Sequence, residues 1–244
     1  MFGLHAKILL LIGISCGLLS SVRAQTATDT PKPPVDEKSV FTDPKVIKLL
    51  DDARTLHSKQ QYFEALAKIT EVETMIPDNP VLINVKGSIY SSMRDFPHAR
   101  ECFERAEKLV PDDMVPKFNK VELLYAETKY AEAEVAFQKL VDTSPKLREE
   151  LRHLSLFKIL VCQLKQDKIA EAEKTMKFFT FMDDTPAYYY SKAAFAFQKG
   201  DKDEGKNWMN KATNIFRADK TAFYIDSMME ARWVPSLQVP SSEK

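Results

Sequence analysis

Residues 80–113 read PVLINVKGSIYSSMRDFPHARECFERAEKLVPDD, and this stretch decides the fold. Asn79-Pro80 supplies an N-cap and a proline at the first helical position, and apolar or small residues then recur at helical spacing. A polar turn follows at residues 94–97, and a second amphipathic run ends before Pro111 because the residue preceding a proline avoids the helical region. The stretch therefore predicts two antiparallel helices. The residues expected to face each other are Ile83, Gly87 and Tyr90 on the first helix and Ala99, Phe103 and Ala106 on the second.

The same pattern recurs along the chain with a period of 34 residues. Three independent columns carry it: Ala65, Ala99 and Ala133; Pro77, Pro111 and Pro145; Ile69, Phe103 and Phe137. The period then slips, because Ala172 and Met176 lie 39 residues after Ala133 and Phe137. We expect the five extra residues in a long helix that runs from about residue 146 to residue 165.

These columns resemble the tetratricopeptide repeat family, and residues 80–113 resemble one complete repeat. The resemblance implies an all-α fold: a right-handed superhelical array of about five helical hairpins plus a C-terminal capping helix that covers the last apolar face. The array is expected to cover residues 45–233. Its units are expected near 46–79, 80–113, 114–147, 153–185 and 186–219, with the capping helix at 219–233.

Composition excludes several classes of protein. The chain has 244 residues, of which 44% are hydrophobic, and its 35 basic residues balance 35 acidic ones. It therefore carries no net charge that would favour nucleic acid. It has only 6 glycines, three of them in the first twenty residues, which argues against glycine-rich phosphate loops and against a turn-rich all-β fold.

The N-terminus is typical of a signal peptide over residues 1–24. His5 and Lys7 give a basic start, residues 8–19 form an apolar stretch, and Val22 and Ala24 offer small side chains at positions −3 and −1 for cleavage. We expect an exported protein, periplasmic or secreted, in a bacterial cell envelope. Two alternatives would attach it to a membrane: an uncleaved signal, or a lipid anchor on Cys16.

Two further segments show no apolar periodicity. Residues 25–44 are rich in proline and threonine and are expected to form a flexible linker, and residues 234–244 are expected to form a disordered tail.

No motif of the chain points to chemistry. Residues 200–206 have the glycine and lysine spacing of a phosphate loop, but acidic residues would repel a phosphate and the repeat register makes the segment a turn. His98 and Cys102 supply two ligands where zinc needs at least three. We expect no catalytic residue, cofactor or metal; an envelope hydrolase that uses His57 and His153 is the enzyme alternative.

The resemblance also implies a groove lined by the first helix of each unit. Its expected lining turns from mixed to aromatic along the chain, which favours contact with a partner protein or peptide. The expected groove residues are Arg54, His57, Asn84, Phe118, Tyr125, Phe157, Val161, Leu164, Tyr190 and Phe197, with Lys165 as a further polar contact. In the alternative interpretation, the same side chains pack in the core and against the capping helix.

The function expected from the groove is that of a non-enzymatic protein–protein interaction scaffold without nucleic acid. The alternative is a structural or assembly factor of a cell-envelope complex, such as pilus or outer-membrane machinery, that acts through its outer faces.

Overall fold

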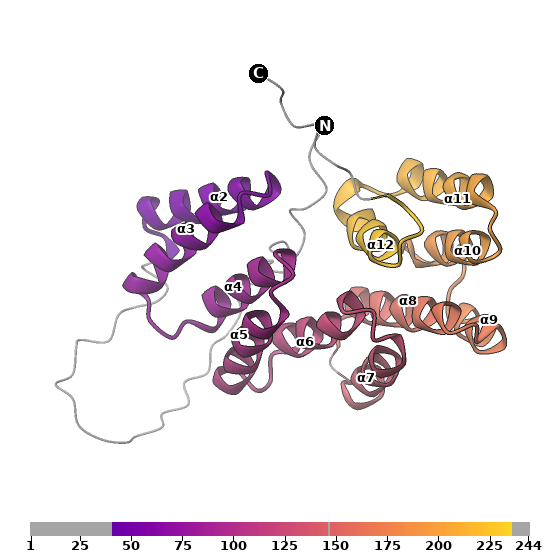
Figure 1. The fold of residues 1–244 in the computed structure, drawn as a ribbon, viewed down its shortest axis with the longest axis horizontal. Helices are drawn as coiled ribbons and strands as arrows, with labels where there is room; N and C mark the ends of the chain where they lie inside the picture. The colour runs from indigo at the N-terminus through magenta and orange to yellow at the C-terminus, as the bar shows by residue number, and fades with distance from the viewer. Residues whose placement is uncertain (1–40, 146, 236–244) are drawn as a thin grey trace. The chain divides into compact units, whose positions relative to one another are not determined.

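The computed structural model describes residues 41–145 and 147–235, and within them every regular element is a helix (Figure 1). The helices are α2 (Pro44–Ser58), α3 (Tyr62–Met75), α4 (Pro80–Ser92), α5 (Phe96–Leu109), α6 (Met114–Ala126), α7 (Tyr130–Thr143), α8 (Glu149–Lys165), α9 (Ile169–Met176), α10 (Ala187–Gln198), α11 (Lys202–Ile215) and α12 (Ala218–Glu230). The all-α prediction is confirmed. None of these helices is both long and apolar enough to cross a bilayer.

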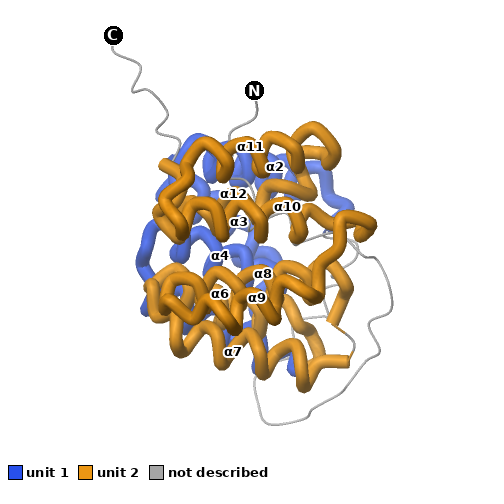
Figure 2. Tube along the Cα trace, turned by 90° about the vertical axis from the view of Figure 1, so that its right-hand side faces the viewer, with its two compact units in different colours: residues 1–111 blue, residues 112–244 orange. Residues whose placement is uncertain are grey.

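Successive helices pair into five hairpins, and α12 follows them, as the repeat pattern predicts. The chain divides into two compact units between residues 111 and 112 (Figure 2). Unit 1 contains α2/α3 and α4/α5, and unit 2 contains α6/α7, α8/α9, α10/α11 and α12. The right-handed superhelix and the domain boundaries remain predictions. The expected signal peptide lies outside the described residues, as do the linker and the tail apart from residues 41–44 and 234–235.

The five hairpin turns share one backbone geometry. In each turn, one residue has a positive φ between 57 and 84°, and the next amide closes the helix by donating to a carbonyl five residues before it. The residues with positive φ are Gln60, Arg94, Thr128, Asp167 and Gly200. Their successive spacings are 34, 34, 39 and 33 residues, which follow the period of 34 and its slip before shortening by one at the last turn. The end of α12 repeats the geometry, because Arg232 has a φ of 59° and the Trp233 amide donates to Met228 O at 3.1 Å.

The slip lies mostly in α8. This helix has 17 residues where α4 and α6 have 13, so four of the five extra residues lengthen α8, and the fifth lies in the loop before it. The start expected near residue 146 is wrong, because α8 begins at Glu149.

A close approach between helices explains the glycine at position 87. A Cβ atom there would lie 2.7 Å from Phe103 Cε1 and 2.9 Å from Cys102 Cβ. Phe103 is buried and cannot move aside, so the second hairpin packs its two helices at a separation that only glycine allows.

Thr128 tests the turn geometry. It is β-branched and exposed at a φ of 60°, where such side chains are strained. We expect Thr128→Gly to raise the free energy of unfolding by about 1 kcal/mol, since glycine adopts this conformation without the steric cost. Urea denaturation measures the change. Thr70→Gly, at an exposed position inside α3, is the control and should destabilise; a loss of stability in Thr128→Gly would contradict the turn geometry.

Candidate functional site

The first helices of the three hairpins in unit 2 are α6, α8 and α10, and α12 lies against α8 and α10 (Figure 1). We define the groove of unit 2 as the face made by Tyr125 of α6, Phe157, Lys158 and Lys165 of α8, and Tyr190 of α10. The Tyr125 hydroxyl donates to Ser227 O of α12 at 2.9 Å, although 102 residues separate the two. Helix α12 therefore contacts all three first helices of its unit, as well as the preceding helix α11.

Tyr224 anchors the middle of α12. Its ring centroid lies 5.1 Å from that of Phe157, and its ring stacks on that of Tyr190 with the two centroids 5.4 Å apart. Its hydroxyl lies 3.1 Å from Thr185 Oγ1, so the buried polar tip is hydrogen-bonded. Ser227 and Met228, one helical turn further, are fully buried. These positions form one face of α12, and that face fills the groove of unit 2.

A buried lysine lies where α6, α8 and α12 meet. Lys158 is 2% exposed, and its Nζ donates to Glu122 Oε2 at 2.7 Å and to Glu230 Oε2 at 3.4 Å. The same nitrogen lies 4.1 Å from the centroid of the Tyr125 ring, within cation–π distance. One carboxylate comes from the groove wall on α6 and the other from α12, so α12 brings a second carboxylate to a buried lysine.

The pKa values of Glu122 and Lys158 are both raised in this cluster, for different reasons. Burial raises the pKa of the Glu122 carboxyl to about 7, because desolvation and the charge of Glu230 together outweigh the attraction of Lys158. Burial works to lower the pKa of Lys158, but the two carboxylates outweigh it and raise that pKa. Lys158 therefore stays charged at neutral pH while Glu122 titrates there.

Lys165 binds the last turn of α12. Its Nζ donates to Ala231 O at 3.0 Å and lies 5.1 Å from the Trp233 ring centroid. Burial and the charge of Arg232 lower its pKa. Lys158 and Lys165 are seven residues apart, two turns along one face of α8, and both contact the C-terminal end of α12.

The titration of Glu122 predicts a pH dependence. Its pKa is higher in the folded chain than the ordinary value of 4.5, so protonation favours folding and stability falls as pH rises from about 4.5 to about 7. We expect Glu122→Gln to remove about 2 kcal/mol of the stability difference between pH 5 and pH 8, as measured by urea denaturation. The exposed Glu132, replaced by glutamine, is the matched control. An unchanged pH profile in Glu122→Gln would contradict the assignment.

The structure overturns the prediction of an open groove in unit 2. Tyr125, Phe157 and Tyr190 contact α12, which covers them. Phe118 packs on Phe137 of α7 with ring centroids 5.8 Å apart, and Phe197 packs against Gly205 of α11. Val161 and Leu164 are also fully buried. These side chains pack in the core and against the last helix, which is the alternative interpretation given in the sequence analysis.

The predicted groove residues of unit 1 are also mostly buried. His57 is buried, with Nε2 2.9 Å from Ser92 Oγ and its ring against Tyr62. Asn84 is buried as well. Arg54 is the one exposed member of the ten, and its Nη1 donates to Asp51 Oδ1 at 2.9 Å.

The two sequence motifs that resemble a phosphate loop and a metal site have structural roles. Residues 200–206 form the last hairpin turn and the start of α11, where Asp201 accepts from the Glu204 amide as an N-cap. His98 Nδ1 lies 2.7 Å from Asp95 Oδ2, and burial raises the pKa of the Cys102 thiol to about 11. Among the residues that the structure describes, no three histidine, cysteine or carboxylate side chains are grouped as metal ligands.

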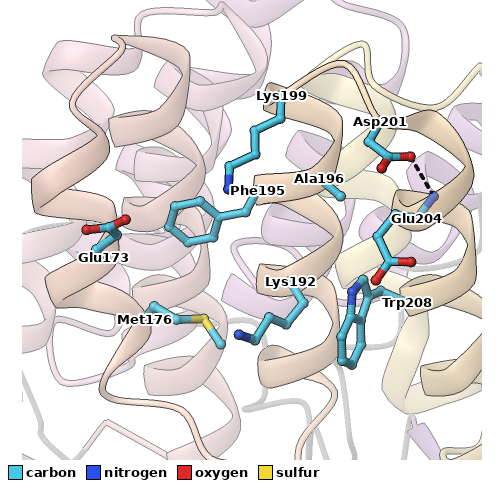
Figure 3. Close-up of a pocket in the computed structure, with 9 residues that line it drawn as sticks. All are labelled: Glu173, Met176, Lys192, Phe195, Ala196, Lys199, Asp201, Glu204 and Trp208. Atoms are coloured by element: carbon cyan, nitrogen blue, oxygen red, sulfur yellow. Dashed lines mark hydrogen bonds between the residues drawn. The ribbon is translucent and has the colours of Figure 1, made fainter.

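A hollow opens on another side of unit 2, where α9 is short (Figure 3). Helix α9 has 8 residues, whereas α3, α5, α7 and α11 each have 14. It ends at Met176, so it leaves part of α10 uncovered. The hollow has a volume of about 490 Å³. Its lining residues are Glu173, Met176, Lys192, Phe195, Ala196, Lys199, Asp201, Glu204 and Trp208.

Aromatic and apolar side chains extend from the hollow onto the loop after α9. The Trp208 ring lies 6.2 Å from Tyr188, which lies 6.5 Å from Phe181. Phe178, Phe181 and Met182 are 65, 67 and 78% exposed. We call these five residues the outer aromatic surface. The repeat pattern does not predict this surface; the run Phe178-Phe179-Thr180-Phe181-Met182, placed between two helices, is the sequence signal for it.

The comparisons with known proteins agree with the hairpin geometry. Residues 82–113 and 186–219 match the model of the tetratricopeptide repeat. The matched residues form α4/α5 in unit 1 and α10/α11 in unit 2, so each unit has one hairpin that is similar to a tetratricopeptide repeat. The other three hairpins share the same turn geometry.

One solved structure and the curated proteins complete the comparison. A structure described as YrrB, a tetratricopeptide repeat protein with an unusual peptide-binding site, is similar at 17% identity and a TM-score of 0.43. The similarity covers 78% of this chain and 95% of that one. No curated protein matches the chain.

Proposed function

We propose that the chain is a non-enzymatic interaction scaffold that binds a partner protein or peptide through the outer aromatic surface of unit 2. One observation carries this proposal: Phe178, Phe181 and Met182 lie within five residues of each other and each exposes about two thirds or more of its side chain. Large apolar side chains grouped in water are typical of contact sites, because covering them removes apolar area from water.

The neighbouring hollow supports the same surface. Phe195 and Trp208 give it apolar walls, and Lys192 and Glu204 place opposite charges at its edge. Lys211 lies 3.9 Å from the Trp208 ring centroid, which keeps a cation beside the ring. A partner suited to this site would insert an apolar side chain into the hollow and pair polar groups at its rim.

The repeats support the class of function. Tetratricopeptide repeats present helix faces to other proteins, and two hairpins of this chain match the repeat. The groove of unit 2, where such repeats are expected to bind, is filled by α12. We therefore assign partner contact to the outer aromatic surface and not to that groove.

A photo-crosslinking experiment tests the proposal. The crosslinking amino acid p-benzoylphenylalanine is placed at position 181, and in a control chain at position 135 of α7, where Val135 is 69% exposed. We expect one discrete crosslinked protein from position 181 and none from position 135. The double variant Phe181→Ser and Met182→Ser should then lose at least tenfold in affinity for that protein. Equal crosslinking from both positions, or unchanged affinity, would reject the outer aromatic surface.

We further propose that the chain acts in a bacterial cell envelope, as its first 24 residues suggest. Use of an outer face also suits an assembly factor of an envelope complex, such as pilus or outer-membrane machinery. The mass of the mature protein tests export. A chain that begins at Gln25 supports a cleaved signal, an acylated Cys16 supports a lipid anchor, and an intact Met1 in the soluble fraction rejects export.

A further inference from the structure

Met182 is the one exposed methionine among the residues that the structure describes. The chain has nine methionines, and all except Met1 lie in the described ranges. The side chain of Met182 is 78% exposed, whereas the others in these ranges are buried or half-buried. An oxidant in solution must reach a sulfur lone pair in order to react with it. The Met182 thioether is therefore the methionine sulfur that an oxidant reaches most easily.

The exposure of Met182 is built into the turn that follows α9. The Met182 amide donates to Thr180 Oγ1 at 3.3 Å, and the Thr180 amide donates to Asp183 Oδ2 at 2.7 Å. The Asp183 amide donates back to Thr180 O at 3.3 Å. These bonds satisfy the backbone within the turn itself and leave the Phe181 and Met182 side chains in water.

The two thiols in the described part of the chain compete poorly for an oxidant. The reactive form of cysteine is the thiolate. Burial raises the pKa of the Cys102 thiol to about 11, and burial also raises the pKa of the Cys162 thiol, so both stay protonated at neutral pH. The Met182 thioether has no such restriction, because it reacts without first losing a proton.

Oxidation of Met182 changes the outer aromatic surface at its most exposed side chain. The sulfoxide replaces an apolar sulfur with a polar S=O group that binds water. A partner that covers this group must desolvate it, which costs free energy unless the partner supplies a hydrogen bond. The sulfoxide of Met182 therefore weakens an apolar contact at this surface.

We propose that Met182 is an oxidation site, at which hydrogen peroxide converts the thioether to the sulfoxide and so releases a partner from the outer aromatic surface. This proposal rests on the proposed function, because it assigns the regulation of the same surface. In the reaction a sulfur lone pair attacks one peroxide oxygen and the O–O bond breaks. The proton of that oxygen passes to the departing hydroxide, which leaves as water. Sulfur loses two electrons and the peroxide gains them.

A dithiol, acting through a methionine sulfoxide reductase, reverses the change. It supplies two electrons and two protons to the sulfoxide, whose oxygen leaves as water, and the dithiol becomes a disulfide. Oxidation of Met182 is therefore a reversible control of the surface.

Mass spectrometry of the peroxide-treated full chain tests whether the reaction is selective. Trypsin releases residues 178–192, in which Met182 is the only methionine, and residues 221–232, which contain Met228 and Met229. We expect the first peptide to gain one oxygen atom at least fivefold faster than the second. Equal rates would overturn the assignment of Met182 as the site.

Retention on phenyl-agarose measures the apolar character of the surface without a partner. Peroxide should make the wild-type chain elute earlier, at a higher ammonium sulfate concentration. Met182→Leu keeps an apolar side chain that cannot be oxidised, so peroxide should leave its retention unchanged. Met114→Leu, at a half-buried position of α6, is the matched control and should shift like the wild type. A shift in Met182→Leu as large as in the wild type would place the reacting methionine elsewhere and overturn the proposal.

Crosslinking from position 181 tests the effect on the partner. Peroxide should lower the yield of the crosslinked protein at least tenfold in the chain with Met182 and leave the yield unchanged in Met182→Leu. An unchanged yield in both chains would overturn the regulation and leave the proposed function standing. No crosslinked protein from the untreated chain would reject the proposed function, and the peptide masses and the phenyl-agarose retention would still decide whether Met182 is the oxidation site.

Discussion

Lys158→Ala is expected to destabilise unit 2 by about 3 to 5 kcal/mol at pH 8. The substitution leaves the carboxylates of Glu122 and Glu230 close together, with Glu122 Oε1 already buried and without a hydrogen-bond partner. The loss should shrink toward pH 5, because protonation of Glu122, whose pKa is about 7 in the wild type, removes one of the two charges. Urea denaturation at both pH values measures the effect.

Two comparisons make this result specific. Lys168 is 43% exposed in its ion pair with Glu134, so Lys168→Ala should cost less than about 1 kcal/mol. The double variant Lys158→Met and Glu122→Gln removes the buried pair from the groove wall and should recover most of the loss. A loss in Lys158→Ala of the same size as in Lys168→Ala would show that the cluster is solvated, contrary to the structure.

Phe157→Ala is the second large effect expected. Phe157 is fully buried, and its ring meets Tyr190 at 6.4 Å and Tyr224 at 5.1 Å, so it joins α8, α10 and α12. Truncation to alanine leaves a cavity and should lower the free energy of unfolding by about 3 to 5 kcal/mol. It should also free α12, since Tyr224 loses one of its two ring contacts.

Denaturant unfolding followed by far-UV circular dichroism measures the loss in Phe157→Ala. Phe178→Ala is the matched control, because Phe178 is 65% exposed and its truncation should change stability by less than about 0.5 kcal/mol. If Phe157→Ala were as mild as the control, Phe157 would lie on an open surface and the groove would be unoccupied.

The hairpins could be predicted because their determinants are local. Proline two residues after the second helix of a hairpin, alanine where helices cross, and a fixed turn length recur at one period, and each acts within about 34 residues of sequence. The last helix follows from the same period, since Phe223 and Ser227 lie 34 residues after Tyr189 and Ala193 in the first helix of the fifth unit.

The occupied groove could not be predicted in the same way. The repeat register states which face of a helix points away from its own hairpin, but it does not state whether a helix from elsewhere in the chain covers that face. The contact between Tyr125 and Ser227 spans 102 residues and depends on the geometry of three hairpins. One signal was present: α8 is apolar on all sides between Leu151 and Leu164, and such a helix is buried on all sides.

The outer aromatic surface was missed for a related reason. The repeat period predicts that the five extra residues lie in a long helix, which is mostly correct for α8. It does not predict that the following helix, α9, is short. A second helix of ordinary length would have covered Phe195 of α10. The early end at Met176 leaves that side chain in an open hollow.

The expected effects of Lys158→Ala and Phe157→Ala both depend on the position of α12 in the groove of unit 2. Nuclear Overhauser effects between selectively labelled tyrosine and phenylalanine rings of the full chain test it directly. We predict cross-peaks from the Tyr224 ring to both Phe157 and Tyr190, whose ring centroids lie 5.1 and 5.4 Å away. A Tyr224 ring with no cross-peak to Phe157 would contradict the account, because α12 would then lie outside the groove.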